Sequence, residues 1–380
     1  MNMIGYGRHN INSKDISNVK NTLKSDFLTQ GPIVKNFENQ LCKKFNSKYC
    51  SAVSSGTAAL HLISKVLNWS KNDEVLCSAI SFAASSNCIL YSKAKVVFCD
   101  IDLNSFNLDL ERTEYLLKRR KKIKSIVATD YAGNPNDWKN LKYLSKKYNV
   151  SLINDNCHAI GSEYFNDIGY ATKYADLVTH SYHAVKTITT GEGGSVLTNN
   201  YKFDQKIKIL RNHGIEHILR KSNFKPKRMI DLGFNYRLTD ILCSLGISQL
   251  SRLDKFVERR RYIAQMYNNT LKNIDNIKLQ KIQHNSLSSY HLYSILIDFK
   301  KIDKSKKNIF DFFLKNKISL QSHYMPIYKH PYYKKIMRIN INDFKNSETF
   351  FRRQVSLPIY FDLKNDQVKK VIFFLEKFLK

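Results

Sequence analysis

The sequence predicts an α/β protein, with a mostly parallel central sheet covered by helices on both faces and a smaller α+β C-terminal domain. Short apolar segments alternate with amphipathic helical segments through the first two thirds of the chain, which is typical of strands joined by helical crossovers. After about residue 255 this alternation stops, and strand-like and helical segments follow without a regular order. We therefore expect a large domain over residues 1–254 and a small domain over residues 255–380.

The first region contains six short apolar runs that read as buried strands. Residues 57–67 (TAALHLISKVL) place six apolar side chains on one stripe, which predicts a helix, and residues 138–148 predict another. The expected strands are Glu74–Ser78, Lys95–Cys99, Ile123–Thr129, Val150–Asn154, Leu177–Ser181 and Ser195–Thr198.

A long helix is expected to lead the chain away from this sheet, from Leu238 through Val257 and into the basic stretch that follows. The segments after it combine both secondary structure types, as an α+β domain requires. They are a strand at Tyr290–Asp298, a helix near Phe310–Lys317, a strand near Ile318–Tyr324 and a final helix from Asn365.

The chain has 380 residues, of which 43% are hydrophobic and 25% are charged, and this composition is typical of a globular protein. No run approaches the roughly 18 apolar residues of a membrane span, and the first fifteen residues lack the apolar core of a secretory signal. The seven cysteines are scattered and never spaced as C-x-x-C. We therefore expect no disulfide framework, no metal site, and a location in the reducing cytoplasm.

The chain is strongly basic, with 62 lysine and arginine residues against 32 acidic ones and a formal net charge of +30. Such a charge can indicate a nucleic acid partner. Here the lysines are spread along the whole chain, and no nucleic-acid-binding motif accompanies them. We expect a generally basic surface without a nucleic acid partner, and note that it would favour an anionic small substrate.

Three of the 13 glycines fall in the tetrapeptide Gly191–Gly194 (GEGG), just after Lys186. So many glycines in one place in a glycine-poor chain indicate a backbone that needs unusual dihedral angles or close approach. A tight turn between two strands is the simpler interpretation. The lysine that follows a buried strand just upstream favours a functional loop.

Asp155 stands where an apolar run ends, so its carboxylate is expected at the carboxyl end of a strand, where α/β sheets bind ligands. Upstream, residues 54–57 (SSGT) open the first predicted helix, whose free N–H groups and dipole suit a phosphate. Each feature alone has an ordinary explanation, such as a helix cap or a solvated lysine. Together they supply what pyridoxal phosphate (PLP) requires: a phosphate site, a carboxylate for the ring nitrogen, and an amine for the aldehyde.

Five blocks of sequence, in order along the chain, resemble the DegT/StrS-type sugar nucleotide aminotransferases, which are aspartate-aminotransferase-like PLP enzymes. The resemblance runs from Leu28 to Pro358 and implies the PLP-dependent transferase fold type I. The blocks are SSGTAALHL (54–62), DYAGNP (130–135), INDNCHAIGSEY (153–164), SYHAVKTITTGEGG (181–194) and GFNYRLTDILCSLGISQL (233–250).

The resemblance implies a role for each matching residue toward PLP. Lys186 matches the lysine that forms the Schiff base and shuttles protons, and Asp155 matches the carboxylate on the pyridine nitrogen. Gly56 and Thr57 match the phosphate cradle, with Ser181 as a third phosphate contact.

Further positions match the cofactor surroundings and the partner subunit. Phe82 stands where the family stacks an aromatic ring on the cofactor, although a core phenylalanine fits the sequence equally well. His158 stands where relatives have Gln or His near the phenolic oxygen of the cofactor. Asn235 matches a residue that reaches the phosphate of a neighbouring subunit, which implies a homodimer with shared sites. Arg237 is expected near a substrate anion.

His323 and Tyr324, in the small domain, match contacts to the nucleotide sugar, and we expect Tyr6 to join them. Within the family, the motifs DYAG, SYHAVKTITTGEGG, NYRLTD and HYMPIY most resemble the branch that acts in pseudaminic acid biosynthesis. This implies amino transfer from L-glutamate to C4 of a UDP-linked 4-keto-6-deoxy-N-acetylhexosamine, giving UDP-4-amino-4,6-dideoxy-N-acetyl-β-L-altrosamine.

Two alternatives to this reaction stay open. One is an aminotransferase for another nucleotide-linked keto sugar, at C3 or C4 and with dTDP or GDP. The other is a PLP-fold protein that binds without catalysis, which the Asp155 and Lys186 pair disfavours. A dehydratase with histidine in place of the lysine is disfavoured because this chain keeps Lys186.

Overall fold

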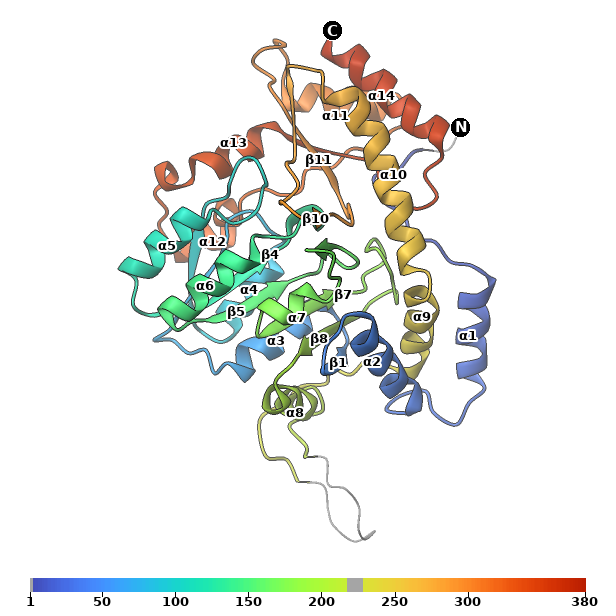
Figure 1. Ribbon diagram of the computed structural model, residues 1–380, viewed down its shortest axis with the longest axis vertical. Coiled ribbons are helices and arrows are strands. Elements are labelled where there is room, and N and C mark those ends of the chain that lie inside the picture. The colour runs from blue at the N-terminus through green and yellow to red at the C-terminus, as the bar shows by residue number, and fades with distance from the viewer. Residues whose placement is uncertain (1–2, 217–227) are drawn as a thin grey trace.

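The computed structural model describes residues 3–216 and 228–380, and a seven-stranded sheet dominates this part of the chain (Figure 1). The strand order is β1-β8-β7-β5-β4-β2-β3, with only β8 antiparallel to its neighbours, so the mostly parallel sheet is confirmed. The strands are β1 (Tyr49–Val53), β2 (Glu74–Ser78), β3 (Lys95–Cys99), β4 (Ile123–Thr129), β5 (Ser151–Asp155), β7 (Leu177–Ser181) and β8 (Gly194–Thr198).

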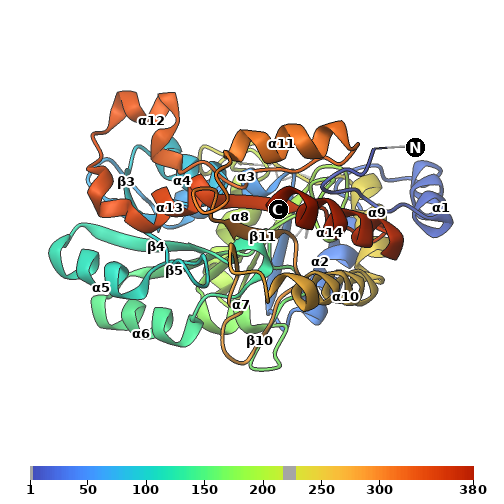
Figure 2. The same ribbon diagram turned by 90° about the horizontal axis from the view of Figure 1, so that it is seen from above.

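Helices cover both faces of this sheet (Figure 2), and alternate strand residues therefore point into two apolar layers. Ile126 of β4 packs in one layer and its neighbour Val127 in the other. One layer holds α2 (Pro32–Lys44), α5 (Leu110–Arg119), α6 (Trp138–Tyr148), α7 (Tyr170–Tyr174) and α9 (Asp240–Leu250), and the other holds α3 (Gly56–Val66), α4 (Ala84–Tyr91) and α8 (Tyr201–Leu210).

The predicted strands of this region are confirmed, those at residues 150–154 and 195–198 with a shift of one residue. The sequence analysis missed β1, whose residues YCSAV include a single β-branched residue, Val53. The edge position of β1 is set by its antiparallel pairing with β8, a contact between residues far apart in the chain.

The C-terminal region has its own antiparallel sheet, with strand order β12-β11-β9, and its own apolar core. The predicted boundary between residues 254 and 255 stays a prediction; both residues lie in one continuous helix, α10. The elements of this core are α10 (Leu253–Leu271), β9 (Ile277–Leu279), β11 (Tyr293–Ile297), α11 (Lys306–Lys315), β12 (Gln354–Leu357) and α14 (Asn365–Leu379).

Two predictions for this region are wrong. The long helix expected from Leu238 is two helices, because the chain leaves helical geometry at Arg252, where φ is −110° and ψ is 4°. The strand expected near residues 318–324 does not form. Its residues make isolated bridges to two different partners instead, Ile318 to Ile4 and Gln321 to Ser356.

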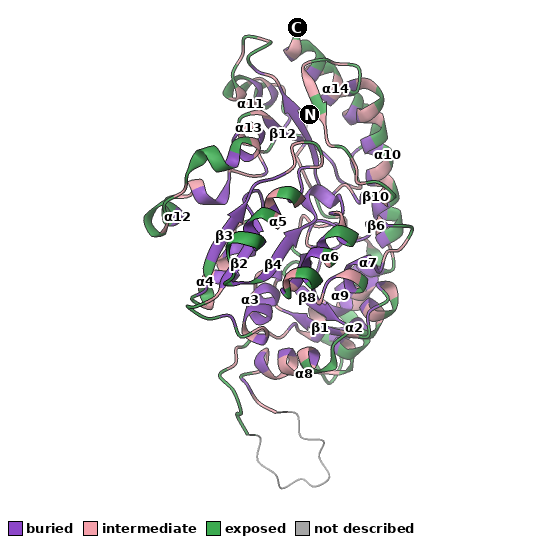
Figure 3. Ribbon diagram, turned by 60° about the vertical axis from the view of Figure 1, so that its left-hand side comes forward, coloured by how far each residue is buried: buried purple, intermediate pink, exposed green. Residues whose placement is uncertain are grey.

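Smaller elements connect these two regions. The N-terminal segment joins the C-terminal region through the Ile4–Ile318 bridge and then enters α1, which packs on α9. Buried residues concentrate on the strands and on the inner faces of the helices (Figure 3). The remaining elements are α1 (Ser13–Leu23), α12 (Pro331–Ile336), α13 (Lys345–Arg353), β6 (Glu163–Tyr164) and β10 (Ser286–Leu287).

A buried carboxylate, Asp130, holds the ends of β4 and β5 together. It accepts hydrogen bonds from the side chains of Asn154 and Asn156, both at 3.2 Å, and from the Tyr170 hydroxyl at 2.7 Å. The side chains of Asn136 and Trp138 donate to the same carboxylate at 2.7 and 3.0 Å. Since Asn154 and Asn156 flank Asp155, Asp130 fixes the strand end that carries the predicted catalytic acid.

Among the helices of the two described ranges, none has both the length and the hydrophobicity needed to cross a bilayer.

Candidate active site

The carboxyl ends of β5 and β7 open into a cavity of about 500 Å³, which residues of the C-terminal region close from the other side. Of the twelve predicted site residues, ten line this cavity. They are Tyr6, Gly56, Thr57, Phe82, Asp155, His158, Ser181, Lys186, His323 and Tyr324.

The start of α3 lines one end of the cavity. Ser55 caps the helix, and its hydroxyl accepts the N–H of Ala58 at 3.0 Å. The N–H groups of Gly56 and Thr57, in the first turn, have no acceptor within the helix. A Cβ on Gly56 would lie 2.9 Å from Ser181 Cβ, so glycine is needed for the helix to begin this close to β7.

The glycine-rich segment Gly191–Gly194 shows both an unusual backbone dihedral angle and a close backbone approach, the two features that the sequence predicted. Gly191 has a φ of +82°, a conformation that favours glycine. A Cβ on Gly194 would lie 2.5 Å from the carbonyl carbon of Ser55, so β8 passes directly against the start of α3. These glycines bring the start of α3 and the lysine loop to one side of the cavity.

Asp155 is the last residue of β5 and is 4% exposed. Its Oδ2 accepts the Ser85 hydroxyl at 2.5 Å, and its Oδ1 accepts the N–H of Cys157 at 3.3 Å. Ser81 Oγ lies 2.6 Å from Ser85 Oγ. Because the Ser85 hydroxyl already donates its proton to Asp155, the Ser81 hydroxyl is the donor in this second hydrogen bond. The sequence analysis missed these two serines, which no pattern around them distinguishes from other helix-start residues.

Lys186 follows β7 and lies on the same cavity wall. Burial lowers the pKa of its ammonium group, while the nearby Cys157 thiol and Asp155 carboxylate act in the opposite direction. The lowered pKa raises the fraction of neutral amine, the form that acts as a nucleophile or base.

His158 and Tyr324 form a polar pair where the C-terminal region closes the cavity. The N–H of Ala132 approaches His158 Nδ1 at 3.4 Å, and His158 Nε2 lies 3.1 Å from the Tyr324 hydroxyl. Because Nδ1 accepts, the neutral ring carries its proton on Nε2 and donates to Tyr324. Burial and the charge of Lys186 hold the pKa of His158 well below its usual range, which favours this neutral form.

His323 lies next to this pair in the cavity lining and is also neutral. Its Nδ1 lies 2.9 Å from the Ser356 hydroxyl, and its ring centroid lies 5.4 Å from that of Tyr6. Burial, followed by the Lys186 charge, lowers the pKa of His323 to about 4. His291, which the sequence analysis missed, also lines the cavity, with its ring centroid 4.7 Å from that of His158. Only the tertiary structure distinguishes it from any other histidine before a strand.

The remaining predicted residues divide into two groups. Phe82 is 58% exposed at the cavity, so it is not a core phenylalanine. Asn235 and Arg237 do not line this cavity. Asn235 is exposed and pairs with Asn212, and Arg237 lines a second cavity of about 340 Å³ and donates to Asn212 Oδ1 at 2.7 Å.

The donor set fits PLP. Free N–H groups at a helix start, in a space that a Cβ at Gly56 would reduce, suit the phosphate. A buried carboxylate suits a protonated ring nitrogen, and an amine with a lowered pKa suits the aldehyde carbon.

The fold and cavity define a PLP-dependent transferase of fold type I. The chain belongs to the DegT/DnrJ/EryC1/StrS aminotransferase family, whose model matches residues 9–376, and it is thus a PLP-dependent sugar aminotransferase.

Three relatives extend over nearly the whole chain. It is 38% identical over 372 residues to the UDP-4-amino-4,6-dideoxy-N-acetyl-beta-L-altrosamine transaminase of Campylobacter jejuni subsp. jejuni serotype O:2, covering 97% of this chain and 96% of that protein. It superimposes on Helicobacter pylori PseC, an aminotransferase involved in the biosynthesis of pseudoaminic acid, with a TM-score of 0.91 at 32% identity, covering 99% and 98% of the two chains. A proposed sugar aminotransferase of Streptococcus pneumoniae in its PLP form gives a TM-score of 0.89 at 25% identity, covering 100% of both chains.

Protonation of His323 makes the fold less stable in acid. Its pKa is about 4 in the folded chain against an ordinary value of 6.5, so between these pH values the unfolded chain binds the extra proton and stability falls as pH falls. From pH 7 to pH 5 this group should account for about 2 kcal/mol of lost unfolding free energy. Urea denaturation should show that His323→Gln loses correspondingly less stability over this range. An equal loss in both proteins would contradict this assignment.

Proposed function

We propose that this protein transfers an amino group from L-glutamate to C4 of a UDP-linked 4-keto-6-deoxy-N-acetylhexosamine. The product is UDP-4-amino-4,6-dideoxy-N-acetyl-β-L-altrosamine, a precursor in pseudaminic acid biosynthesis. One observation carries the proposal: Asp155 and Lys186 line one cavity beside a helix start suited to phosphate. The choice of substrate is supported by relatives with 33–38% identity that are named for this product.

When bound, PLP supplies an electron sink for the charge that develops when a proton leaves carbon. Asp155 would hold the protonated ring nitrogen, because its carboxylate is an acceptor held in place by Ser85 and the Cys157 N–H. Lys186 Nζ takes the Cα proton of glutamate and later returns a proton on the sugar half of the reaction. Its lowered pKa supplies the neutral amine that proton removal requires.

The histidine and tyrosine side chains that line the cavity are suited to a sugar. His158, His291 and His323 all have pKa values lowered by burial, so they face the cavity as neutral rings. Because His158 donates to Tyr324, the Tyr324 hydroxyl proton remains free to donate to a ligand. Neutral donors and acceptors bind sugar hydroxyls without a fixed charge. Phe82 offers an exposed aromatic face at the same cavity.

We further propose that the enzyme is a cytoplasmic homodimer in which Asn235 reaches the site of the partner subunit and Arg237 helps to hold a substrate anion. Asn235 is exposed and lies away from its own cavity, which supports a role toward a second chain. All seven cysteines are free, which supports a reducing compartment.

Amino transfer is tested by incubating PLP-loaded protein with glutamate and UDP-, dTDP- and GDP-linked keto sugars, with mass spectrometry and NMR of the products. We expect amination at C4 of the UDP-4-keto-6-deoxy-N-acetylhexosamine. In Lys186→Ala the turnover rate should fall by roughly 10²–10⁴-fold or more. Lys202→Ala, at an exposed lysine of α8, should retain the wild-type rate.

Amination of only another sugar would support the alternative substrate, and no transfer to any sugar would support a binding protein. Undiminished turnover in Lys186→Ala would refute the role of this lysine.

Shared sites are tested by mixing two inactive variants, Asn235→Ala and Lys186→Ala. In a homodimer, mixed dimers have one site that combines an intact Lys186 with an intact Asn235 from the partner subunit. Random exchange of equal amounts should therefore restore about one quarter of the wild-type activity per chain. If Asn235 serves its own chain, no activity returns after exchange. An affinity tag on one variant, which co-purifies the untagged variant from mixed dimers, reports whether exchange took place.

A further inference from the structure

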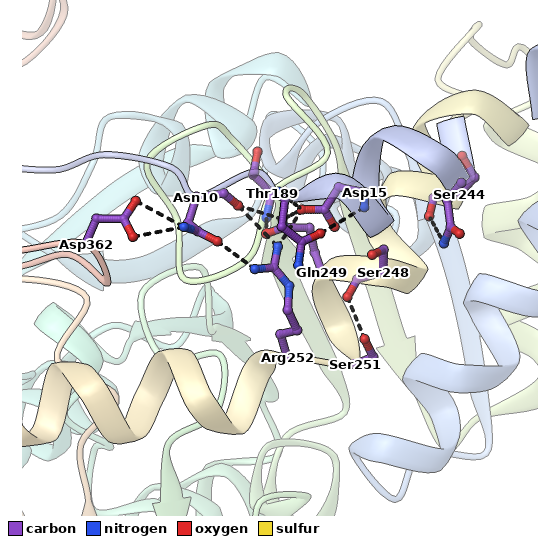
Figure 4. A network of polar contacts seen from close by, with 11 residues as sticks. Asn10, Asp15, Thr189, Ser244, Ser248, Gln249, Ser251, Arg252 and Asp362 are labelled. Carbon is purple, nitrogen blue, oxygen red and sulfur yellow. Dashed lines mark hydrogen bonds and ion pairs between the residues drawn. The ribbon is translucent and has the colours of Figure 1, made fainter. Parts of the chain in front are cut away.

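The loop of residues 182–193, which carries Lys186, is held mostly by its own hydrogen bonds. The N–H of Thr190 donates to the Tyr182 carbonyl at 2.9 Å, and the N–H of Gly191 donates to Thr189 Oγ1 at 2.8 Å. In the described part of the chain, one side chain from outside β7, β8 and the loop hydrogen-bonds to it. The side-chain carbonyl of Gln249, near the end of α9, accepts the N–H of Thr189 at 3.4 Å (Figure 4).

The surroundings of Gln249 allow only one orientation of its amide. Its Nε2 donates to the Asn10 carbonyl and to Asp15 Oδ2, both at 2.9 Å. A flipped amide would place its oxygen against these two acceptors and its NH₂ group against the Thr189 N–H. Gln249 is 1% exposed, so bulk solvent does not replace a lost partner. The carbonyl oxygen is therefore fixed toward the lysine loop.

A buried ion pair holds the acceptors of Gln249 in place. Arg252 Nη2 lies 2.5 Å from Asp15 Oδ2, and Asp15 is fully buried. Arg252 Nη1 donates to Asn10 Oδ1 at 2.6 Å, and the Asn10 side-chain amide donates to both oxygens of Asp362 at 2.9 and 3.1 Å. Figure 4 shows these contacts as one network around Gln249. The network joins the N-terminal segment, the α9–α10 junction and the C-terminal region.

The network reaches the catalytic lysine itself. Asn10, Gln249 and Lys186 line one small cavity of about 10 Å³, which is roughly the space of one water molecule. Thr189 is only three residues from Lys186 along a loop with few other anchors. A shift of Thr189 is therefore transmitted to the lysine backbone.

We propose that Gln249 is a positioning residue for Lys186, which anchors the lysine loop to the N-terminal segment, with Asp15 and Arg252 fixing its amide. This inference rests on the proposed role of Lys186. Misplacing a reacting group by about 1 Å can cost about 100-fold in rate, so a loosened loop should lower turnover without removing any group that touches substrate.

The test compares Gln249→Met, which keeps the side-chain length but removes all three hydrogen bonds, with Ser251→Ala as a matched control. The Ser251 hydroxyl donates only to the Ser248 carbonyl at 2.7 Å, within the same helix end. In PLP-free protein, acetic anhydride labelling of Lys186 is followed by mass spectrometry across pH, and amide hydrogen exchange is followed over residues 186–191. In PLP-loaded protein, kcat and KM are measured.

In Gln249→Met we expect the midpoint of Lys186 labelling to rise by about one pH unit, because a released loop lets water reach the amine. Asp155 and Cys157, which act on the lysine charge, are untouched by this change. Exchange at Thr189 should be about tenfold faster, and kcat should fall about tenfold while the sugar KM stays within about twofold. Ser251→Ala should match the wild type throughout.

An unchanged labelling midpoint and unchanged exchange in Gln249→Met would overturn the proposal, even with a lower melting temperature. If that variant does not fold, amide hydrogen exchange is measured in the wild-type protein instead. There the Thr189 amide, which Gln249 holds, should exchange more slowly than the Val185 amide. Equal exchange rates would overturn the proposal. Because labelling and exchange need no turnover, a failure of the proposed amino transfer is distinguishable from a failure of this inference.

Discussion

The active site depends on one geometric constraint: neighbouring parallel strands end at the same edge of a sheet. β5 pairs with β7 in parallel, with Asp155 opposite Thr179, so the acid and the lysine loop leave the sheet side by side. β1 runs in the same direction, and α3 therefore also begins at this edge. Asp155 and Lys186, 31 positions apart, thus meet in one cavity, and α3 begins beside them.

Burial then determines the charges that face the cavity. It lowers the pKa of Lys186 and of His158, His291 and His323, so each of these groups is biased toward its neutral form. Part of the basic charge of the chain is also structural. Arg260 is buried and donates to the carbonyls of Tyr290, His291 and Ile359, which are neutral acceptors in the C-terminal region.

The sequence predicts the parts of this site that local chemistry determines. Asp155 at a strand end, the Gly56 helix start and the glycines after Lys186 each carry a signal in their own neighbourhood, and the structure places all of them as predicted. Ser85, His291 and Gln249 carry no such signal, because their roles come from contacts with residues far away in the chain. The break at Arg252 was missed for the same reason: its side chain is held by Asp15 and Asn10.

The central claim is that Asp155 holds a proton on the cofactor ring while Lys186 acts at the other end. Nitrogen-15 NMR of protein loaded with ring-labelled PLP measures that proton directly. The chemical shift should report a protonated nitrogen across neutral pH in the wild type, and a deprotonated nitrogen in Asp155→Ala. A ring nitrogen that stays protonated in Asp155→Ala, or is unprotonated in the wild type, would contradict the account.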